Sequence, residues 1–326
     1  MQRSTPTRTL VVTDGHAGNV RQARALADAL KLPTQDLILR PRLPWRWFAP
    51  RIVGNAERAF GDEFAQRLRD PDLAQTLVIG CGRQAALATR LLRARGAHAV
   101  QILDPRIDTS HWDVVISPAH DRLRAPNAIE LTGSLNPVQD TWLGASRAAF
   151  AALGSLPGPR TTLLIGGPTS NMRLSVRRLD RWLRDVRTLI EREGGSVLAT
   201  TSRRTPPKMV ARVKKRLAGL PGVVWTGSVD GRNPYAALLG WADRIICTAD
   251  SVNMLSEASA TRAPVFVAGE RKIRGRPRRF VNALLKSGRI QPLSRELARF
   301  DAEPMRETQR VAALLRERFG LPAPSK

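Results

Sequence analysis

The chain has 326 residues, and its 53 Lys and Arg residues against 28 Asp and Glu residues give a formal net charge of +25. No apolar run approaches the ~20 residues of a membrane-spanning helix, and 42% hydrophobic residues suffice for ordinary cores, which excludes an integral membrane protein and a wholly disordered chain. Two distant cysteines, Cys81 and Cys247, exclude a disulfide framework. No signal-peptide-like apolar core follows Met1, which predicts a cytoplasmic protein.

The basic excess is concentrated in residues 151–326, which carry 33 of the basic residues and 14 of the acidic ones. Such a surplus favours an anionic partner: a phosphate-bearing ligand, an anionic membrane surface or nucleic acid. Genomic base composition is a competing explanation, because only 7 of the 53 basic residues are lysine. Nucleic acid is the least favoured partner, because no known binding module is recognisable.

Short apolar runs alternate with segments of helical period in the first half of the chain. Because these runs are apolar throughout, they are typical of a parallel sheet that is covered on both faces. The predicted strands are residues 9–13, 36–39, 76–79, 99–103, 114–117 and 128–131, and the predicted helices are residues 19–30, 83–95 and 138–153.

Residues 154–159 (GSLPGP) interrupt both periods and predict a linker. The alternation then restarts, with predicted strands at residues 161–165, 196–200, 223–226, 244–247 and 265–268 and helices at 174–193, 207–217, 234–241 and 251–260. Two such series predict an α/β fold with two doubly wound domains facing one another, residues 1–154 and 160–326.

Two stretches do not fit this alternation. Residues 41–51 (PRLPWRWFAPR) interleave aromatic side chains with arginines, which indicates either an interfacial membrane anchor or a loop packed on the first domain. Residues 271–279 (RKIRGRPRR) form a basic run, which indicates a solvated face; phosphate contact is the less favoured interpretation.

Ligands of open α/β sheets bind at the carboxyl ends of the strands. Residues 14–19 (DGHAGN) follow the first strand, and either Asp14 or His16 could take a proton from an attacking hydroxyl. The alternative is a tight turn in which Asn19 caps the following helix. The Gly-x-x-Gly spacing differs from Gly-x-Gly-x-x-Gly and so disfavours a dinucleotide site.

Residue types suited to phosphate follow two strands of the second half. Gly166 and Gly167 end the first of them and offer backbone N–H groups. The next strand is followed by hydroxyl and guanidinium side chains suited to phosphate oxygens, those of Ser202, Arg203, Arg204 and Thr205. Either segment could also be a plain turn.

Residues 248–258 (TADSVNMLSEA) open a predicted helix. Ser251, Asn253 and Met254 fall in its first turn, where N–H groups can bind a diphosphate, and Glu257 can hold the two hydroxyls of a ribose. The alternative is that Asp250 or Ser251 caps the helix and Glu257 is solvated. No His, Cys or carboxylate spacing indicates a metal, and no cofactor is expected.

This segment resembles the Asp-Ser-x-x-Met-x-x-Glu-Ala…Pro-Val pattern of the mitochondrial-fission "elongated mitochondria" family, and the resemblance spans roughly residues 8–290. Plant members of that family are tied to organelle division, and bacterial members are assigned as glycosyltransferases by similarity. Further matches follow in the same order, at Asp14-Gly15…Gly18…Gln22, Asp104-Pro105-Arg106, Pro118…His120-Asp121, Gly166-Gly167, Ser202–Thr205 and Tyr235…Leu239-Gly240…Ala242-Asp243.

The resemblance implies a GT-B-like fold, in which two Rossmann-type domains face a central cleft and the C-terminal domain binds most of a nucleotide sugar. Glu257 matches the position that holds the ribose. The expected function is metal-independent glycosyl transfer from a nucleotide-diphosphate sugar to a cell-envelope glycolipid or polysaccharide. A nucleotide-sugar epimerase of the same architecture and a non-catalytic peripheral membrane adaptor are the alternatives. The expected location is the cytoplasm, at the inner face of the membrane if the chain is peripheral.

Overall fold

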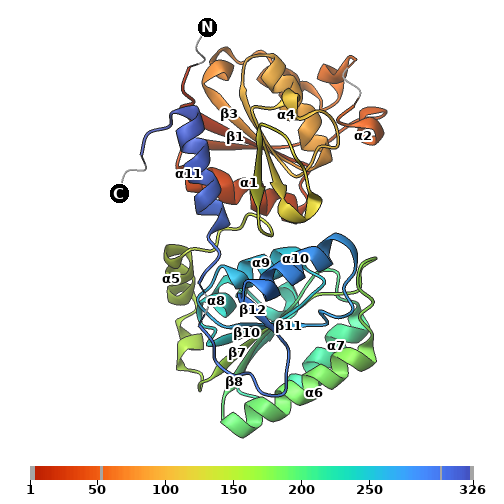
Figure 1. Cartoon of the computed structure of the whole chain (residues 1–326), viewed down its shortest axis with the longest axis vertical. Helices are drawn as coiled ribbons and strands as arrows, with labels where there is room; N and C mark the ends of the chain where they lie inside the picture. Colours follow the sequence, from red (N-terminus) through yellow and green to blue (C-terminus); the bar gives the residue numbers. More distant parts are fainter. Residues whose placement is uncertain (1–3, 52–53, 302, 324–326) are drawn as a thin grey trace. The chain divides into compact units, whose positions relative to one another are not determined.

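The structure, a computed structural model, describes residues 4–51, 54–301 and 303–323. The chain divides into two units, each built on its own parallel sheet (Figure 1). Unit 1 combines the chain up to Pro137 with the segment from Glu307 onwards, and unit 2 is Val138–Arg306. This division differs from the predicted domains 1–154 and 160–326, because the predicted linker at residues 154–159 lies inside unit 2.

The sheet of unit 1 has six parallel strands in the order β2-β1-β3-β4-β5-β6. The order of the strands along the chain reverses between β1 and β3, which makes this pair the topological switch point. The strands are β1 (Arg8–Thr13), β2 (Thr34–Ile38), β3 (Thr76–Cys81), β4 (His98–Ile102), β5 (Val114–Pro118) and β6 (Ala128–Leu131). Every predicted strand of this half is present, because the central strands are buried on both faces.

Helices cover both faces of this sheet. One face is covered by α1 and α11, whose Leu26 and Leu315 belong to the same buried cluster. The other is covered by α4 and by the segment that contains α2 and α3. The helices of unit 1 are α1 (Ala17–Leu30), α2 (Trp45–Phe48), α3 (Asp62–Arg67), α4 (Arg83–Ala94) and α11 (Glu307–Phe319).

The sheet of unit 2 also has six parallel strands, in the order β9-β8-β7-β10-β11-β12. Counted along the chain this is the 3-2-1-4-5-6 order of dinucleotide-binding folds, with the switch point between β7 and β10. The strands are β7 (Arg160–Ile165), β8 (Ser196–Thr201), β9 (Gly222–Trp225), β10 (Arg244–Thr248), β11 (Val265–Ala268) and β12 (Ile290–Pro292).

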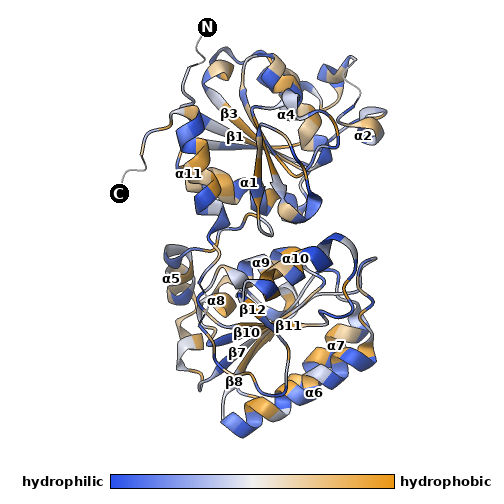
Figure 2. Cartoon of the chain, in the orientation of Figure 1, coloured by the Kyte–Doolittle hydropathy of each residue, from blue (hydrophilic) through white to orange (hydrophobic). Residues whose placement is uncertain are grey.

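In unit 2, α6 and α7 cover one face of the sheet and α8, α9 and α10 cover the other (Figure 1). Helix α6 shows how the sequence specifies such an element: Ser175 Oγ accepts from Arg178 N at 3.3 Å to cap its start, and Gly194 in a left-handed conformation ends it. The buried residues of α6 are all apolar, and along its ribbon hydrophobic residues alternate with hydrophilic ones (Figure 2), as in an amphipathic helix. The helices are α5 (Asp140–Ala149), α6 (Val176–Glu193), α7 (Pro207–Leu217), α8 (Tyr235–Gly240), α9 (Val252–Ser259) and α10 (Gly275–Lys286).

Side-chain contacts explain where the units divide. Helix α5 packs on α8, and Arg147 Nη1 donates to the carbonyl of Gly240 at 3.2 Å, so α5 belongs to unit 2. The start of α11 returns to unit 1, where Thr308 Oγ1 donates to the carbonyl of Asn136 at 2.8 Å. The Pro- and Gly-rich break at residues 154–159 is therefore a turn within unit 2.

None of the helices in the described part of the chain combines the length and the apolar character that crossing a bilayer requires.

A buried guanidinium holds the carboxyl end of α9. Arg289 Nε donates to the carbonyl of Ser259 at 2.8 Å, and its Nη2 donates to the carbonyl of Thr261 at 2.7 Å. Burial lowers the pKa of Arg289 to about 10, so the group remains protonated at neutral pH. A cation at this end complements the negative pole of the helix and satisfies carbonyls that lack partners within it.

We expect Arg289→Ala to lower the free energy of unfolding of unit 2 by about 2–4 kcal/mol, because charged hydrogen bonds are lost and buried carbonyls are left unpaired. Urea unfolding followed by circular dichroism measures the change. Lys286→Ala removes an exposed charge from the nearby end of α10 and should leave the midpoint almost unchanged. Equal midpoints for the two variants would contradict this role of Arg289.

Candidate functional site

The candidate site begins where β7 and β10 end, at the switch point of unit 2. The N–H of Gly166 donates to Thr248 Oγ1 at 2.8 Å, which ties the loop after β7 to the end of β10. Asp250 follows two residues later, and its side chain is fully buried. One of its oxygens, Oδ2, accepts from the N–H of Gly167 at 3.0 Å and from Arg204 Nη2 at 3.1 Å. Three strand ends thus converge on one carboxylate.

The close approach of Asp250 explains both glycines. A Cβ at Gly166 would lie 2.1 Å from Asp250 Oδ2, and a Cβ at Gly167 would lie 2.5 Å from the carbonyl oxygen of Arg204. The N–H groups of both glycines are already donated within the protein, to Thr248 and Asp250. The prediction that these two N–H groups are available to a diphosphate is therefore wrong; the glycines instead allow the loops to pack.

The predicted phosphate-binding segment after β8 divides into two parts. Ser202 Oγ and Thr205 Oγ1 lie 3.1 Å apart, and Thr205 Oγ1 donates to the carbonyl of Gly166 at 2.8 Å, so these hydroxyls hold the turn. Arg203 is exposed, and the side chain of Arg204 is 47% exposed although it pairs with Asp250. Of this segment, the two arginines are the groups that face solvent.

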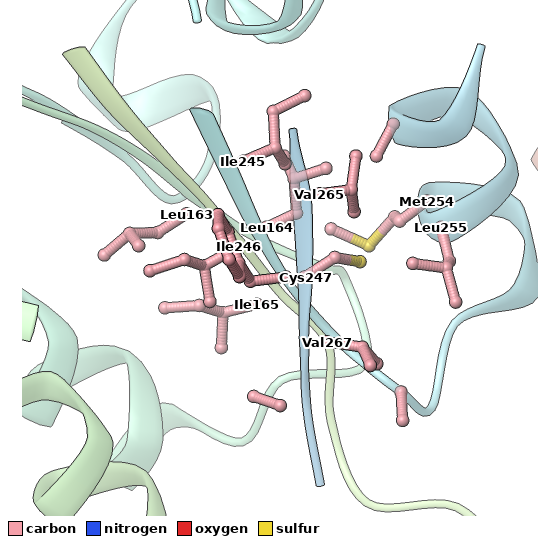
Figure 3. Close-up of a cluster of buried hydrophobic side chains, with 14 of the residues drawn as sticks. Leu163, Leu164, Ile165, Ile245, Ile246, Cys247, Met254, Leu255, Val265 and Val267 are labelled. Carbon is pink, nitrogen blue, oxygen red and sulfur yellow. The ribbon is translucent and has the colours of Figure 1, made fainter. Parts of the chain in front are cut away.

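Helix α9 begins at the site. Ser251 is its N-cap, and Ser251 Oγ accepts from Met254 N at 3.4 Å, as one interpretation of the sequence predicted. Asn253 is half-buried in the first turn. The side chain of Met254 lies in the apolar cluster around Cys247 and Leu255 beneath the site (Figure 3). Met254 therefore contributes packing through its side chain.

Glu257 is buried in α9, where only 1% of the residue is exposed. The alternative that it is a solvated helix residue is therefore wrong. Its Oε2 accepts a hydrogen bond from the hydroxyl of Tyr235, which belongs to α8. Neither Tyr235 nor Asp250 is predicted from the sequence to bind the ligand. The signal for Tyr235 was that it is the single tyrosine of the chain, within a matched motif.

Negative charge gathers beneath the site. The pKa of the Cys247 thiol is raised well above its usual value, first by burial and then by the carboxylates of Asp250 and Glu257. Both carboxylates therefore act on the same buried sulfur. Within residues 4–51, 54–301 and 303–323, no group of three or more His, Cys, Asp and Glu side chains could hold a metal ion.

The loop of unit 1 that carries Asp14 and His16 follows β1 at the switch point of that sheet. Asp14 Oδ1 accepts from Asn19 Nδ2 at 3.0 Å and from the N–H of His16 at 3.1 Å. His16 is exposed and occupies the N-cap position of α1, so the alternative that Asn19 caps this helix is wrong. Asn19 instead holds Asp14. Gly82 has a φ of +90°, and a Cβ there would lie 2.6 Å from Asn19 Nδ2, so backbone conformation and packing both explain that glycine.

A cavity of about 460 Å³ lies at the other edge of the unit 2 sheet, near the amino ends of β7 and β10. Its lining includes Asp243, Arg244, Arg262 and Phe300. None of the predicted site residues lines it. Arg244 is itself paired with Glu193, which gives it a structural role at that edge.

Comparison with known proteins fits this arrangement. The family model for mitochondrial fission ELM1 matches residues 17–319. The chain belongs to the mitochondrial fission ELM1 family. The match begins just after Asp14 and His16, so membership in the family does not strengthen the assignment of either as a base.

Two curated proteins are similar in sequence to this chain. The mitochondrial fission protein ELM1 of Arabidopsis thaliana is 30% identical over 243 residues, which cover 66% of this chain and 56% of the plant protein. The chain thus aligns with little more than half of that relative. An uncharacterized protein of Rickettsia prowazekii is 22% identical over 353 residues, covering 94% of this chain and 97% of the relative.

Solved structures show the fold of the ELM1 family member. A UDP-GlcNAc 2-epimerase from Methanocaldococcus jannaschii has 13% identity and a TM-score of 0.56, covering 95% of this chain and 99% of that one. MurG from Acinetobacter baumannii has 12% identity and a TM-score of 0.52, covering 96% and 100%. An S. aureus MnaA–UDP co-structure has 14% identity and a TM-score of 0.50, covering 96% and 90%. The predicted GT-B-like class with two doubly wound domains is confirmed.

We expect Gly166→Ala to lower the stability of unit 2 by about 2–3 kcal/mol, because the added methyl group must displace the carboxylate of Asp250 from its partners. Thermal and urea unfolding measure the loss. Gly144→Ala is the matched control, since nothing lies within 4 Å of the added Cβ on α5 and the change should stabilise the helix by up to about 1 kcal/mol. A neutral Gly166→Ala would show that Asp250 does not occupy this position.

Proposed function

We propose that this chain binds a nucleotide-diphosphate sugar at the carboxyl edge of the unit 2 sheet and transfers the sugar to an acceptor hydroxyl. The supporting observation is the convergence of polar groups from three strand ends at the switch point between β7 and β10. Ligands of open α/β sheets bind at such points. The similarity of the fold to an MnaA–UDP co-structure makes UDP the first nucleotide to test.

In this proposal the diphosphate lies against the exposed guanidinium groups and the start of α9. Arg204 keeps nearly half of its side chain exposed while one nitrogen pairs with Asp250, so its remaining N–H groups can bind phosphate oxygens. Arg203 is exposed beside it. The positive pole at the N-terminus of α9, behind the Ser251 cap and before Asn253, adds a third source of attraction.

Glu257 would hold the ribose through the carboxylate that now accepts from Tyr235. A carboxylate has two oxygens and can accept hydrogen bonds from both hydroxyls of a ribose. The ribose would compete with the Tyr235 hydroxyl for Glu257. Tyr235 would then position the carboxylate and select ligands that offer a vicinal diol. In this proposal Tyr235 acts beside Glu257 in binding the ribose.

The chemical step would form a bond between the acceptor oxygen and the anomeric carbon, while the bond from that carbon to the diphosphate breaks and the nucleoside diphosphate leaves with the electron pair. The proton of the acceptor hydroxyl would pass to Asp14 or His16 on the loop after β1. Arg203 and Arg204 would stabilise the charge that develops on the leaving diphosphate. In this proposal the reaction needs no bound metal or cofactor.

An epimerase is the second candidate, because an epimerase from M. jannaschii shares the fold. It would act on the sugar nucleotide alone, whereas a transferase also needs an acceptor. Incubation of the protein with UDP-GlcNAc and no acceptor, followed by NMR, separates the two: a 2-epimer favours the epimerase. A chain that binds no nucleotide at all would fit the membrane adaptor instead.

We expect Glu257→Gln to weaken UDP binding by about 1–3 kcal/mol, because charge-assisted hydrogen bonds to the ribose become neutral ones. Isothermal titration calorimetry with UDP measures the affinity. The control is Glu296→Gln, which removes an exposed carboxylate elsewhere in unit 2 and should leave the affinity unchanged. Wild-type protein that gives no heat with any nucleoside diphosphate would refute the proposed function.

A further inference from the structure

Exposed apolar side chains are concentrated in one short segment of unit 1. Ile38, Leu43, Trp47 and Phe48 are 61%, 56%, 66% and 49% exposed. Among the described residues, the remaining exposed large apolar side chains are Val229 and Leu314, which are distant in sequence. A cluster of exposed apolar groups, unlike single ones, indicates an interaction surface.

All charged residues of the same segment are basic. Residues 37–56 contain Arg40, Arg42, Arg46 and Arg51 and no acidic residue. All four arginines are exposed. Aromatic and guanidinium groups therefore alternate on one surface, a composition suited to the headgroup level of a membrane.

The inner side of the segment is fixed to unit 1, as the interpretation of a loop packed on the first domain predicts. Trp45 packs against the core cluster below, and Ala49 and Pro50 are buried. Two arginines of α4 hold the chain from beneath. Arg90 Nη1 donates to the carbonyl of Pro50 at 3.0 Å. The segment is thus a packed loop on its inner side and an exposed apolar surface on its outer side.

Arg83, the second of these arginines, removes an obstacle to membrane contact. Its Nη1 donates to the carbonyl of Trp47 at 2.8 Å and its Nη2 donates to the carbonyl of Arg46 at 3.0 Å. Carbonyls at the end of a short helix such as α2 normally depend on water, and losing that water in a lipid interface is costly. Because Arg83 satisfies these two carbonyls, Trp47 and Phe48 can enter an apolar layer without leaving them unpaired.

We propose that this aromatic–arginine face (Leu43, Trp47 and Phe48 with Arg42, Arg46 and Arg51) docks on an anionic lipid surface. The face lies at the margin of unit 1, where α2 projects (Figure 1). Charged residues are depleted from the centre of protein–protein interfaces, whereas here they alternate with the aromatic residues, which favours lipid over a protein partner. This inference is independent of the nucleotide-sugar site and stands whether or not that site is active.

The first test is sedimentation of the full chain with vesicles of phosphatidylcholine, with and without phosphatidylglycerol. Wild-type protein should sediment with the anionic vesicles and not with the neutral ones. The double variant Trp47→Ala/Phe48→Ala should bind roughly tenfold or more weakly, since two large apolar groups no longer enter the interface. Val229→Ala/Leu314→Ala removes two exposed apolar groups elsewhere and should bind like wild type.

A second pair of variants separates this face from the general effect of a net charge of +25. Arg42→Ala/Arg46→Ala/Arg51→Ala should weaken binding by about tenfold or more, because each arginine near an anionic surface contributes several-fold. Arg271→Ala/Lys272→Ala/Arg274→Ala removes the same charge from exposed residues of unit 2 and should have a much smaller effect. Thermal unfolding verifies that all variants remain folded.

Any one of the following results would overturn the proposal: no sedimentation of wild type with anionic vesicles, unchanged binding of the aromatic variant, or equal losses in the two charge variants. Fluorescence quenching by brominated lipid gives a residue-level reading. Quenching should fall in Trp47→Phe and persist in Trp45→Phe, because Trp45 packs on the protein core. Unchanged quenching in both variants would also contradict docking through this face.

Discussion

A carboxylate that is buried away from water must be compensated by donors and charge, and Oδ2 of Asp250 has such partners from two different loops. It lies after β10, and its partners come from the loop after β7, through the N–H of Gly167, and from the loop after β8, through Arg204. Their positions at the carboxyl edge are therefore coupled. Glycine at positions 166 and 167 follows from this close packing. A methyl group at 166 would overlap with the carboxylate of Asp250, and one at 167 would overlap with the backbone of Arg204.

This arrangement also determines which groups remain for a ligand. The glycine N–H groups, usual partners of phosphate at a strand end, are consumed by the protein, and the outward-facing donors are those of Arg203 and Arg204. Beneath them lie two buried carboxylates, those of Asp250 and Glu257. A basic rim above an acidic floor suits a ligand with phosphates at one end and hydroxyl groups at the other.

The sequence predicts elements best where local rules decide them. Helix α7 begins at Pro207 and β11 at Val265 as expected, because a proline stands at or before each start. Helix α10 was missed, because its arginine-rich first turn resembles a solvated loop and its apolar residues come only later. The return of α11 to unit 1 depends on contacts such as Thr308 with Asn136, across 172 residues, which no local pattern reveals. For the same reason the residue types of the site were recognisable, but the contact between Gly167 and Asp250, 83 residues apart, was not.

Each sheet has an aspartate close to a cysteine at its switch point. The two aspartates differ in burial, and this difference separates their roles. Each sheet pairs a strand-end cysteine with a nearby aspartate, Cys81 with Asp14 in unit 1 and Cys247 with Asp250 in unit 2, and in both the pKa of the thiol is raised by burial and by that carboxylate. Asp250 is fully enclosed and its charge is spent on holding loops. Asp14 is only half-buried, and a neutral amide from Asn19 holds it without cancelling its charge. Of the two, Asp14 is the carboxylate that keeps access to solvent, which the proposed role of a proton acceptor requires.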